Sequence, residues 1–396
     1  MNENGKKPLG VYVHIPFCVK KCDYCDFVSF PLCESGEPSP DSYIDALAEE
    51  IRGYRDKFGC KDTEYLVKTV YIGGGTPSVL APFYIVRILD LIREVFDLEE
   101  DAEITIEVNP GTVDADKLAE YRKAGINRLS IGLQSANDNE LKELGRIHDY
   151  ADFVRAYEEA AAAGFDNMNV DVMTAIPLQT MDSLKYTLDK VTGLTPKPRH
   201  ISAYSLILEE GTLFYEKYVT KKMSACPILP DEDMERAMYY CVVDHLKKHG
   251  YERYEISNFS QPGFMSRHNS AYWRRREYIG FGLAASSLLN EVRYRNTLKM
   301  DDYLLAPCSK DLFEEETVLT DKDRMSEFMF LGLRMLRGVK AGDFVRLFGR
   351  ELTHVYGSEI ERLVDDGLIV HDMKDDAYHL TDRGVDYGNY VFSMFV

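Results

Sequence analysis

Long apolar runs are absent from this 396-residue sequence, because no uninterrupted apolar stretch approaches the roughly 18 residues that a membrane-spanning helix needs. The first residues, Met1 to Pro8, lack the apolar core of a secretion signal. Repeats of fixed period and low-complexity tracts are also missing. We therefore expect a cytoplasmic protein with no integral membrane segment.

An excess of positive charge is absent as well. The chain has 47 basic and 66 acidic residues, which gives a formal net charge of −19. Phosphate backbones and anionic lipid headgroups would repel such a chain, so nucleic acid is not an expected partner. The remaining composition, 45% hydrophobic and 29% charged, is ordinary for a globular protein of two or three domains.

Cysteine departs from this ordinary pattern. Three of the eight cysteines, Cys18, Cys22 and Cys25, follow an apolar strand with the spacing C-x3-C-x2-C, while the other five are scattered singly (Cys33, Cys60, Cys226, Cys241, Cys308). Thiolates are the usual ligands of iron–sulfur clusters, and three of them leave the fourth iron of a cubane open. A zinc site would need a fourth Cys or His nearby. The alternative is three unrelated thiols. A reactive triad fits a reducing compartment better than a disulfide framework does.

Up to about residue 220, short strand patterns alternate with helical patterns, which predicts six βα units on a parallel sheet, too few for a closed eight-fold barrel. Strands are expected at Gly10–Ile15, Thr69–Ile72, Glu103–Val108, Arg128–Ile131, Met168–Val172 and His200–Tyr204. Helices are expected at Asp41–Phe58, Pro82–Phe96, Asp114–Ala124, Asn137–Glu143, Tyr150–Ala163 and Thr180–Val191.

Polar residues follow the carboxyl ends of these strands, where parallel α/β folds bind ligands. Three glycines, Gly73 to Gly75, come after the second strand and would let backbone groups approach a ligand closely. Glu107 and Asp171 end the third and fifth strands, and a buried carboxylate at a strand end needs a partner. Gln134, Arg146 and Ser205 lie at or after the other strands. A tight strand–helix turn is the alternative interpretation of the glycines.

The cysteine motif resembles that of the radical S-adenosylmethionine superfamily. The segment from Tyr12 to Cys18, YVHIPFC, is similar to the branch that contains the oxygen-independent coproporphyrinogen III oxidases and the HemW haem chaperones. The oxidases carry a further cysteine two places after the third, where this chain has Phe27, so the resemblance points to HemW. It implies an α/β fold: a partial (βα)6 radical-SAM barrel with a C-terminal HemN-type winged-helix-like α+β domain.

The resemblance also implies the ligands. Cys18, Cys22 and Cys25 would hold a 4Fe-4S cluster, and no residue is assigned as a certain catalytic group. Ten residues would hold S-adenosylmethionine: Tyr12, Tyr24, Gly74, Gly75, Thr76, Glu107, Gln134, Arg146, Asp171 and Ser205. One departure concerns the loop after Asp171, where the family has Gly-Leu-Pro-Gly-Gln and this chain has Ala175 to Gln179, AIPLQ. We expect that loop to adopt a conformation that residues with a Cβ tolerate.

A second motif follows a long helix expected at Asp231–His249 and a strand-like segment, Tyr251–Ile256. His268 begins the sequence HNSAYW, which resembles the HemW motif H-N-x-x-Y-W and implies that His268 binds haem. Imidazole is a normal axial ligand of haem iron, and Tyr and Trp offer a flat apolar wall. A structural histidine is the alternative. The segment from Gly280 to Ser287 continues the family pattern, and we expect it to pack on the barrel mouth.

Three arginines, Arg274 to Arg276, follow this motif directly in an otherwise acidic chain. Guanidinium groups match carboxylates geometrically, so part of this run is a candidate partner for porphyrin propionates. A solvated charged run is the alternative.

The C-terminal segment follows a loop around Ala306–Glu316. It has helical patterns at Asp323–Leu336, Ala341–Phe348 and Ser358–Asp366, then a hairpin of Leu368–His371 and Ala377–Leu380. Residues 321 to 396 carry ten Lys or Arg and fourteen Asp or Glu, a net charge of −4, so we expect a lid or docking module and not a DNA-binding domain.

Together these features predict three regions: a barrel at 1–225, a connecting segment with the haem motif at 226–315, and the C-terminal domain at 316–396. The resemblance implies a haem chaperone that delivers haem to respiratory apo-proteins, with flavodoxin or ferredoxin as electron donor if radical chemistry occurs. Two alternatives stay open: a radical enzyme acting on a porphyrin, such as the coproporphyrinogen oxidase, and a scaffold that uses a cluster for stability.

Overall fold

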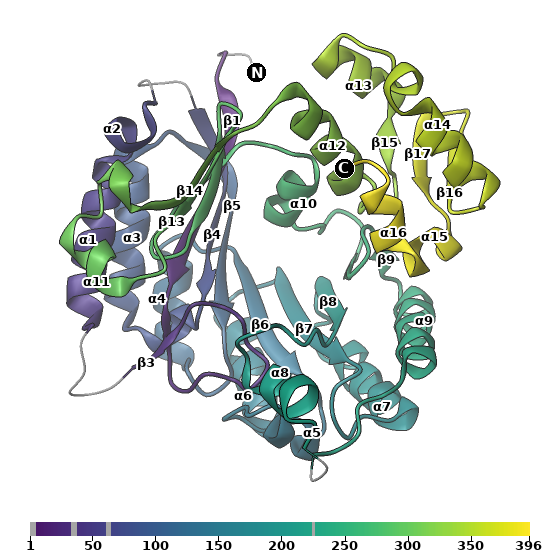
Figure 1. The fold of residues 1–396 in the computed structure, drawn as a ribbon. Coiled ribbons are helices and arrows are strands. Elements are labelled where there is room, and N and C mark those ends of the chain that lie inside the picture. The colour runs from purple at the N-terminus through teal and green to yellow at the C-terminus, as the bar shows by residue number, and fades with distance from the viewer. Residues whose placement is uncertain (1–4, 33–37, 61–64, 224–225) are drawn as a thin grey trace.

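The structure is a computed structural model that describes residues 5–32, 38–60, 65–223 and 226–396. Cys33 lies outside the described residues. A twelve-stranded sheet in the order β14-β13-β12-β11-β1-β4-β5-β6-β7-β8-β10-β9 forms the centre of the molecule (Figure 1). Its middle strands are parallel neighbours: β1 (Lys7–Ile15), β4 (Tyr65–Gly74), β5 (Leu98–Val108), β6 (Arg128–Gln134), β7 (Met168–Thr174) and β8 (His200–Ser205). The six predicted strands are confirmed.

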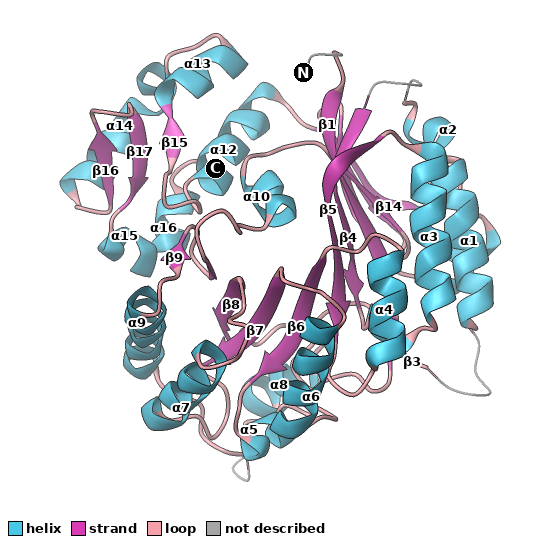
Figure 2. Cartoon of the chain, turned by 180° about the vertical axis from the view of Figure 1, so that it is seen from behind, coloured by secondary structure: helices cyan, strands magenta, loops and turns pink. Residues whose placement is uncertain are grey.

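Helices connect these strands and cover the outer face of the sheet (Figure 2). They are α1 (Pro40–Arg52), α2 (Tyr54–Phe58), α3 (Pro82–Val95), α4 (Ala115–Lys123), α5 (Asp138–Glu143), α6 (Tyr150–Ala162) and α7 (Met181–Thr192). The prediction of one helix over Asp41–Phe58 is wrong, because the chain breaks at Gly53. A Cβ at Gly53 would lie 2.6 Å from the Cys308 Sγ, so the break fits a close contact there.

The segment after β8 extends the sheet at both edges; the strand-like segment Tyr251–Ile256 indicated only β9, and the sequence did not indicate the other added strands. After α8 (Leu213–Tyr215) and α9 (Glu232–Lys248), the short strands β9 (Glu252–Arg253) and β10 (Asn258–Ser260) join β8. Strand β11 (Tyr278–Phe281) then pairs in parallel with β1, and β12 (Ser286–Leu289), β13 (Val292–Asn296) and β14 (Phe313–Val318) follow in antiparallel order. The expected loop around Ala306–Glu316 therefore ends earlier, at β14, after helix α11 (Met300–Leu305). Likewise, Gly280 and Phe281 belong to a sheet strand and do not merely pack on the barrel mouth.

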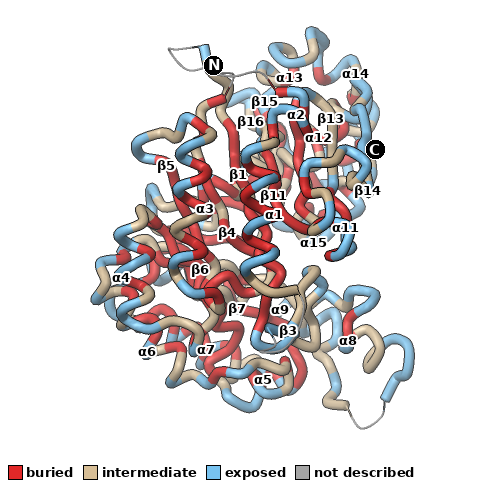
Figure 3. Tube along the Cα trace, turned by 90° about the vertical axis from the view of Figure 1, so that its left-hand side faces the viewer, coloured by how far each residue is buried: buried red, intermediate tan, exposed pale blue. Residues whose placement is uncertain are grey.

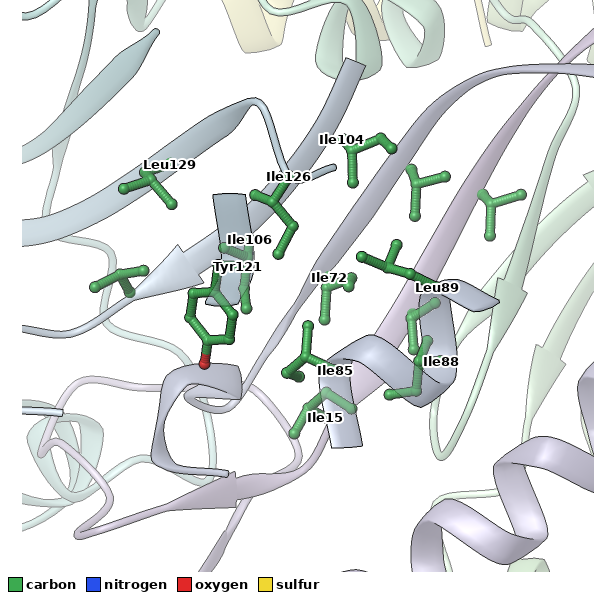
Figure 4. Close-up of a cluster of buried hydrophobic side chains, with 14 of the residues drawn as sticks. Ile15, Ile72, Ile85, Ile88, Leu89, Ile104, Ile106, Tyr121, Ile126 and Leu129 are labelled. Atoms are coloured by element: carbon green, nitrogen blue, oxygen red, sulfur yellow. The ribbon is translucent and has the colours of Figure 1, made fainter. Parts of the chain in front are cut away.

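The main core lies between the sheet and its outer helices. Ile15, Ile72 and Ile106 project from three neighbouring strands against Ile85 and Ile88 of α3 (Figure 4). All five side chains are fully buried. In Figure 3 the central strands are buried along most of their length, whereas the outer helices alternate between buried and exposed turns. Burial of this apolar face fixes the positions of the strands, and with them the loops at their carboxyl ends.

The C-terminal part forms a second core between Met325 and Phe395. It contains α12 (Asp321–Gly332), α13 (Ala341–Phe348), α14 (Leu352–Asp365), α15 (Asp382–Asp386) and α16 (Gly388–Ser393), with a three-stranded sheet of β15 (Val339–Lys340), β17 (Ala377–Leu380) and β16 (Ile369–Asp372). The predicted winged-helix-like arrangement is confirmed, although α14 begins six residues before the expected Ser358. Within the described ranges, no helix is both long and apolar enough to cross a membrane.

Candidate functional site

The three clustered cysteines lie on the loop that follows β1. Cys18 ends the short strand β2 (Phe17–Cys18), which pairs with β3 (Phe30–Pro31), and Cys22 and Cys25 follow in the loop. All three are free thiols and line one cavity of about 140 Å³. Burial raises the pKa of the Cys18 thiol, and it raises that of Cys25 to about 11. Without a metal, the Cys18 and Cys25 thiols stay protonated at neutral pH.

The glycine loop at the end of β4 packs directly against the cysteine loop. The backbone N–H groups of Gly75 and Thr76 donate to the carbonyls of Ile15 and Phe17 at 2.8 and 2.7 Å. A Cβ on Gly74, whose φ is 111°, would lie 2.4 Å from His14 Nδ1, and one on Gly75 would lie 2.7 Å from the Phe17 carbonyl oxygen. Only glycine fits these positions, and the predicted close approach of backbone to the cysteine loop is therefore present.

Two carboxylates follow the next strands inside the same cavity. Glu107 accepts hydrogen bonds from the Tyr71 hydroxyl at 2.8 Å and from the Gly74 N–H at 3.0 Å. Burial raises the pKa of Glu107 to about 7, although these two hydrogen bonds each act to lower it. Asp171 accepts from the Asn169 amide at 2.8 Å, and burial raises its pKa too. Both groups thus have room to interact with a cationic or hydroxyl-bearing ligand.

Arg146 links the cysteine loop to two strands. Its guanidinium donates to the Asn109 side chain and the Gly132 carbonyl, both at 2.7 Å, and lies 3.7 Å from the Cys22 Sγ. The Nε of Arg146 is buried with no hydrogen-bond partner in the described structure. A buried N–H with no partner is costly, and an anionic ligand in the cavity would supply one.

Gln134 completes this side of the cavity at a bulge of β6, with φ at +73°. Its Oε1 accepts from the Tyr204 hydroxyl at 3.1 Å. A non-glycine residue in the left-handed region is strained, and such strain is often found at functional sites.

The structure brings most of the predicted residues together, but not all in one place. Tyr24, Gly74, Gly75, Thr76, Glu107, Gln134, Arg146 and Asp171 line the 140 Å³ cavity with the three cysteines. Ser205 lines the adjoining barrel cavity of about 450 Å³, where its hydroxyl lies 3.1 Å from that of Thr174. Tyr12 lines a third cavity together with Tyr272 and Tyr278, and its hydroxyl lies 3.0 Å from His14 Nδ1.

Sequence reasoning missed three residues that line or support the site, Tyr71, Asn109 and Asn169. Tyr71 lies two residues before Gly73 of the glycine motif on β4, and Asn169 lies two residues before the predicted Asp171 on β7. The alternation of side chains along a strand therefore places them on the same face. Asn109 donates to Thr76 Oγ1 at 2.8 Å while it accepts from Arg146. The alternation of strand side chains was the signal that could have found Tyr71 and Asn169.

The loop after Asp171 contradicts the expectation of a conformation that tolerates a Cβ. Ala175 and Leu178 occupy the two positions where the family has glycine, and their φ angles are +57° and +66°. The loop therefore keeps the left-handed conformation despite the side chains, at a cost of roughly 1–2 kcal/mol for each residue. The tertiary fold outweighs this local preference.

The haem motif lies on α10 (Arg267–Trp273), which packs inside the curved sheet between β4 and α12 (Figure 1). His268 is 2% exposed and stacks on Tyr71 with a centroid distance of 5.1 Å. Its Nδ1 lies 2.8 Å from Thr69 Oγ1, and its Nε2 lies 2.8 Å from the Tyr272 hydroxyl. Burial and Arg128 lower the pKa of His268 to about 3, so the ring is neutral at pH 7. Both ring nitrogens are therefore engaged within the protein.

The three arginines after this motif have different surroundings. Arg275 forms ion pairs with Glu291 and Glu327. Arg274 lines a cavity beside β1 and α10, and Arg276 lines both that cavity and the one that holds Tyr12. The run therefore does not act as one patch.

Replacement of Glu107 by Gln is expected to change how stability depends on pH. The folded-state pKa of about 7 lies above the ordinary 4.5, so the folded chain retains a proton that the unfolded chain has lost. Stability from this group is present at low pH and is lost as pH rises through 7. The wild-type free energy of unfolding should thus fall by about 1–3 kcal/mol more than that of Glu107→Gln between pH 5 and 8.

Urea unfolding of the ligand-free chain at the two pH values measures this difference. Glu361→Gln, at an exposed position of α14, is the matched control for the change in charge. Parallel pH profiles for wild type and Glu107→Gln would contradict the prediction.

The comparisons with known proteins agree with this geometry. The family model of the Radical SAM superfamily matches residues 12–191, and that of the HemN C-terminal domain matches residues 319–387. The solved coproporphyrinogen III oxidase HemN of Escherichia coli, a radical SAM enzyme, superposes with a TM-score of 0.83 at 24% identity, covering 99% of this chain and 90% of that one. The fold and its cysteine loop thus define a radical SAM protein.

Curated relatives narrow this class. The chain is 39% identical to the haem chaperone HemW of Lactococcus lactis over 99% of its own length and 98% of the relative's. It is 35% identical to the HemW of Bacillus subtilis, with 97% and 98% covered, and 33% identical to that of Escherichia coli, with 98% of both covered. The chain belongs to the HemW family.

Proposed function

We propose that this chain binds a 4Fe-4S cluster, S-adenosylmethionine and haem, and that it acts in the cytoplasm as a chaperone delivering haem to respiratory apo-proteins. One observation carries the proposal: three free cysteines, a glycine loop and the side chains of Glu107, Arg146 and Asp171 meet at one cavity. The names of the curated relatives support the haem part.

The residues present fit an iron–sulfur cluster with one open iron. No three His, Cys, Asp or Glu side chains in the described ranges lie close enough together to hold a single metal ion. A cubane holds its ligands farther apart than one ion does, so Cys18, Cys22 and Cys25 around a shared cavity suit a cluster. Arg146 beside Cys22 and Thr76, whose hydroxyl lies 3.4 Å from the Cys18 Sγ, would stabilise the thiolates.

The same cavity fits an amino-acid-bearing nucleotide. Glu107 and Asp171 can accept hydrogen bonds from such a ligand, and the free Nε of Arg146 can donate one. If a cluster were bound at Cys18, Cys22 and Cys25, its reduced form would supply the one electron that splits S-adenosylmethionine into methionine and a 5′-deoxyadenosyl radical. The chain's own part is to orient the nucleotide and to exclude water. It also keeps the Glu107 carboxyl in the cavity, where a cationic ligand would favour its ionised form.

His268 is our proposed haem-binding residue, and the HNSAYW motif supports it. To ligate iron, its imidazole must give up one of its two hydrogen bonds, most directly the one between Nε2 and the Tyr272 hydroxyl. His268→Ala is therefore expected to weaken haem binding by about tenfold or more and to shift the absorption spectrum. Tyr272→Phe frees Nε2 and should bind haem at least as tightly as wild type.

Haem titration of anaerobically reconstituted protein, followed by its absorption, measures both variants. Thr69→Ser, which keeps a hydroxyl at Nδ1, is the matched control. Equal losses in His268→Ala and Tyr272→Phe would contradict ligation by His268 and would point to the Tyr272 oxygen.

A radical enzyme acting on a porphyrin is the second candidate, and the intact site around the cysteines favours it. Phe27, which takes the place of the fourth cysteine of the oxidases, counts against the coproporphyrinogen oxidase itself. An anaerobic assay with a reduced flavodoxin or ferredoxin separates the candidates. Product from coproporphyrinogen III would support the enzyme, and transfer of bound haem without that product would support the chaperone.

A further inference from the structure

A cavity of about 630 Å³ lies beside the barrel cavity and shares Asp26 and Phe27 with it. It is bordered by Phe27 and Val28 of the cysteine loop, by Tyr272 and Trp273 of α10, and by Leu331 of α12. Strands β1, β11, β12 and β13 contribute the other strand residues of its wall. Its volume is in the usual range for a drug-sized or cofactor-sized ligand.

The walls of this cavity are largely flat and apolar. Tyr12, Tyr272 and Tyr278 contribute aromatic rings, with Tyr272 and Tyr278 packed edge to face at 4.6 Å. Leu288 and Leu298 add aliphatic surface. Such walls bury the faces of a planar ring system better than they bury a sugar or a phosphate.

Four arginines and one aspartate, Asp26, are the side chains of full charge in the lining of the cavity. Two of the arginines are already in ion pairs, because Arg275 pairs with Glu291 and with Glu327 at 2.7 Å, and Arg293 pairs with Glu327 at 2.6 Å. Arg276 and Arg295 are exposed, and in the described parts of the chain their guanidinium groups form no ion pair or hydrogen bond. The cavity therefore presents two uncommitted guanidinium groups beside an apolar surface, in a chain of net charge −19.

We propose that this cavity holds a planar tetrapyrrole and that Arg276 and Arg295 bind its two carboxylates. The inference rests on the proposed haem function and names the site and the recognition groups. A guanidinium matches a carboxylate with two parallel hydrogen bonds, and two such groups beside flat apolar walls match a ring that carries two acidic side chains. The cavity also contains Tyr272 and Trp273, so the haem motif forms one of its walls.

The test compares two ligands and three single variants. Haem and its dimethyl ester, in which the carboxylates are masked, are titrated into wild-type protein and into Arg276→Gln, Arg295→Gln and Arg274→Gln. Each variant loses one positive charge, but Arg274 faces the other cavity and serves as the control. All three arginines are exposed, so folding should be unaffected.

We expect Arg276→Gln and Arg295→Gln each to weaken haem binding by about tenfold, with the double variant weaker still. Binding of the dimethyl ester should be the same in all variants, and Arg274→Gln should match wild type. Unchanged haem affinity in the double variant would overturn this inference and leave haem binding intact. A wild-type chain that binds no haem would overturn the proposed function as well.

Discussion

Serine at Cys18, Cys22 and Cys25 together is expected to remove nearly all iron and sulfide from anaerobically reconstituted protein, together with the visible absorption of the cluster. Serine keeps the size of the side chain but offers a hard hydroxyl in place of a thiolate, which an iron–sulfur cluster requires. Each single replacement should already lower iron content strongly, because one open iron position is tolerated and two are not. Iron and sulfide analysis with absorption spectra measures the effect.

The scattered cysteines provide the matched control for this experiment. Cys241 lies on the outer helix α9 and Cys308 lies against Gly53, both far from the cysteine loop in sequence. The double variant Cys241→Ser and Cys308→Ser should retain wild-type iron content. Unchanged iron in the triple variant, or equal loss in the control, would remove the cluster and with it the proposed role of the cavity.

Lys57→Met is expected to lower the free energy of unfolding by about 3–5 kcal/mol, because it leaves a buried carboxylate without its counter-ion. Lys57 and Glu50 are both buried and pair at 2.6 Å. Lys57 also donates to the Asn296 side chain and the Pro307 carbonyl, so α2 is tied to β13 and to the segment after α11. Chemical denaturation at pH 7 measures the loss.

The other oxygen of Glu50 explains why this loss would reach the functional region. It accepts from the Gly282 N–H at 2.7 Å and from the Tyr303 hydroxyl at 2.8 Å, and Tyr43 donates to the His14 carbonyl beside them. Arg87→Met, which breaks a 2.7 Å ion pair with Asp45 at the surface, is the control and should cost less than about 1 kcal/mol. A loss of that size for Lys57→Met would contradict the prediction.

Local patterns in the sequence predicted the barrel well. In the barrel, short strand patterns with many buried residues alternate with helical patterns, and the side chains at the strand ends face one cavity because parallel strands end at the same edge. The structure accordingly brings the cysteines, Glu107 and Asp171 together at one cavity. The helix break at Gly53 was missed, and the close approach of Cys308 to this glycine, from more than 250 positions away, cannot be seen in a local sequence pattern.

Pairing between distant segments was the part that the sequence did not reveal. Strand β13, with the sequence VRYRN, is short and polar, and its place in the sheet depends on β12 and β14. Arg295 reaches the cavity of Arg276 only through that pairing. The motif identified His268 as a candidate residue but did not show which way its side chain points. The i, i+4 spacing of His268 and Tyr272 on a helix already favours their contact.

Phe27 stands at the position of the missing cysteine and is 60% exposed. Its side chain lines three cavities: the one that the cysteines share, the barrel cavity, and the cavity of Arg276 and Arg295. The Phe27 ring can take only one orientation at a time. A nucleotide bound in the cysteine cavity would therefore restrict the orientation of the ring that haem meets in its own cavity, and haem would do the same for the nucleotide. By thermodynamic linkage, any factor by which the nucleotide changes haem affinity is also the factor by which haem changes nucleotide affinity.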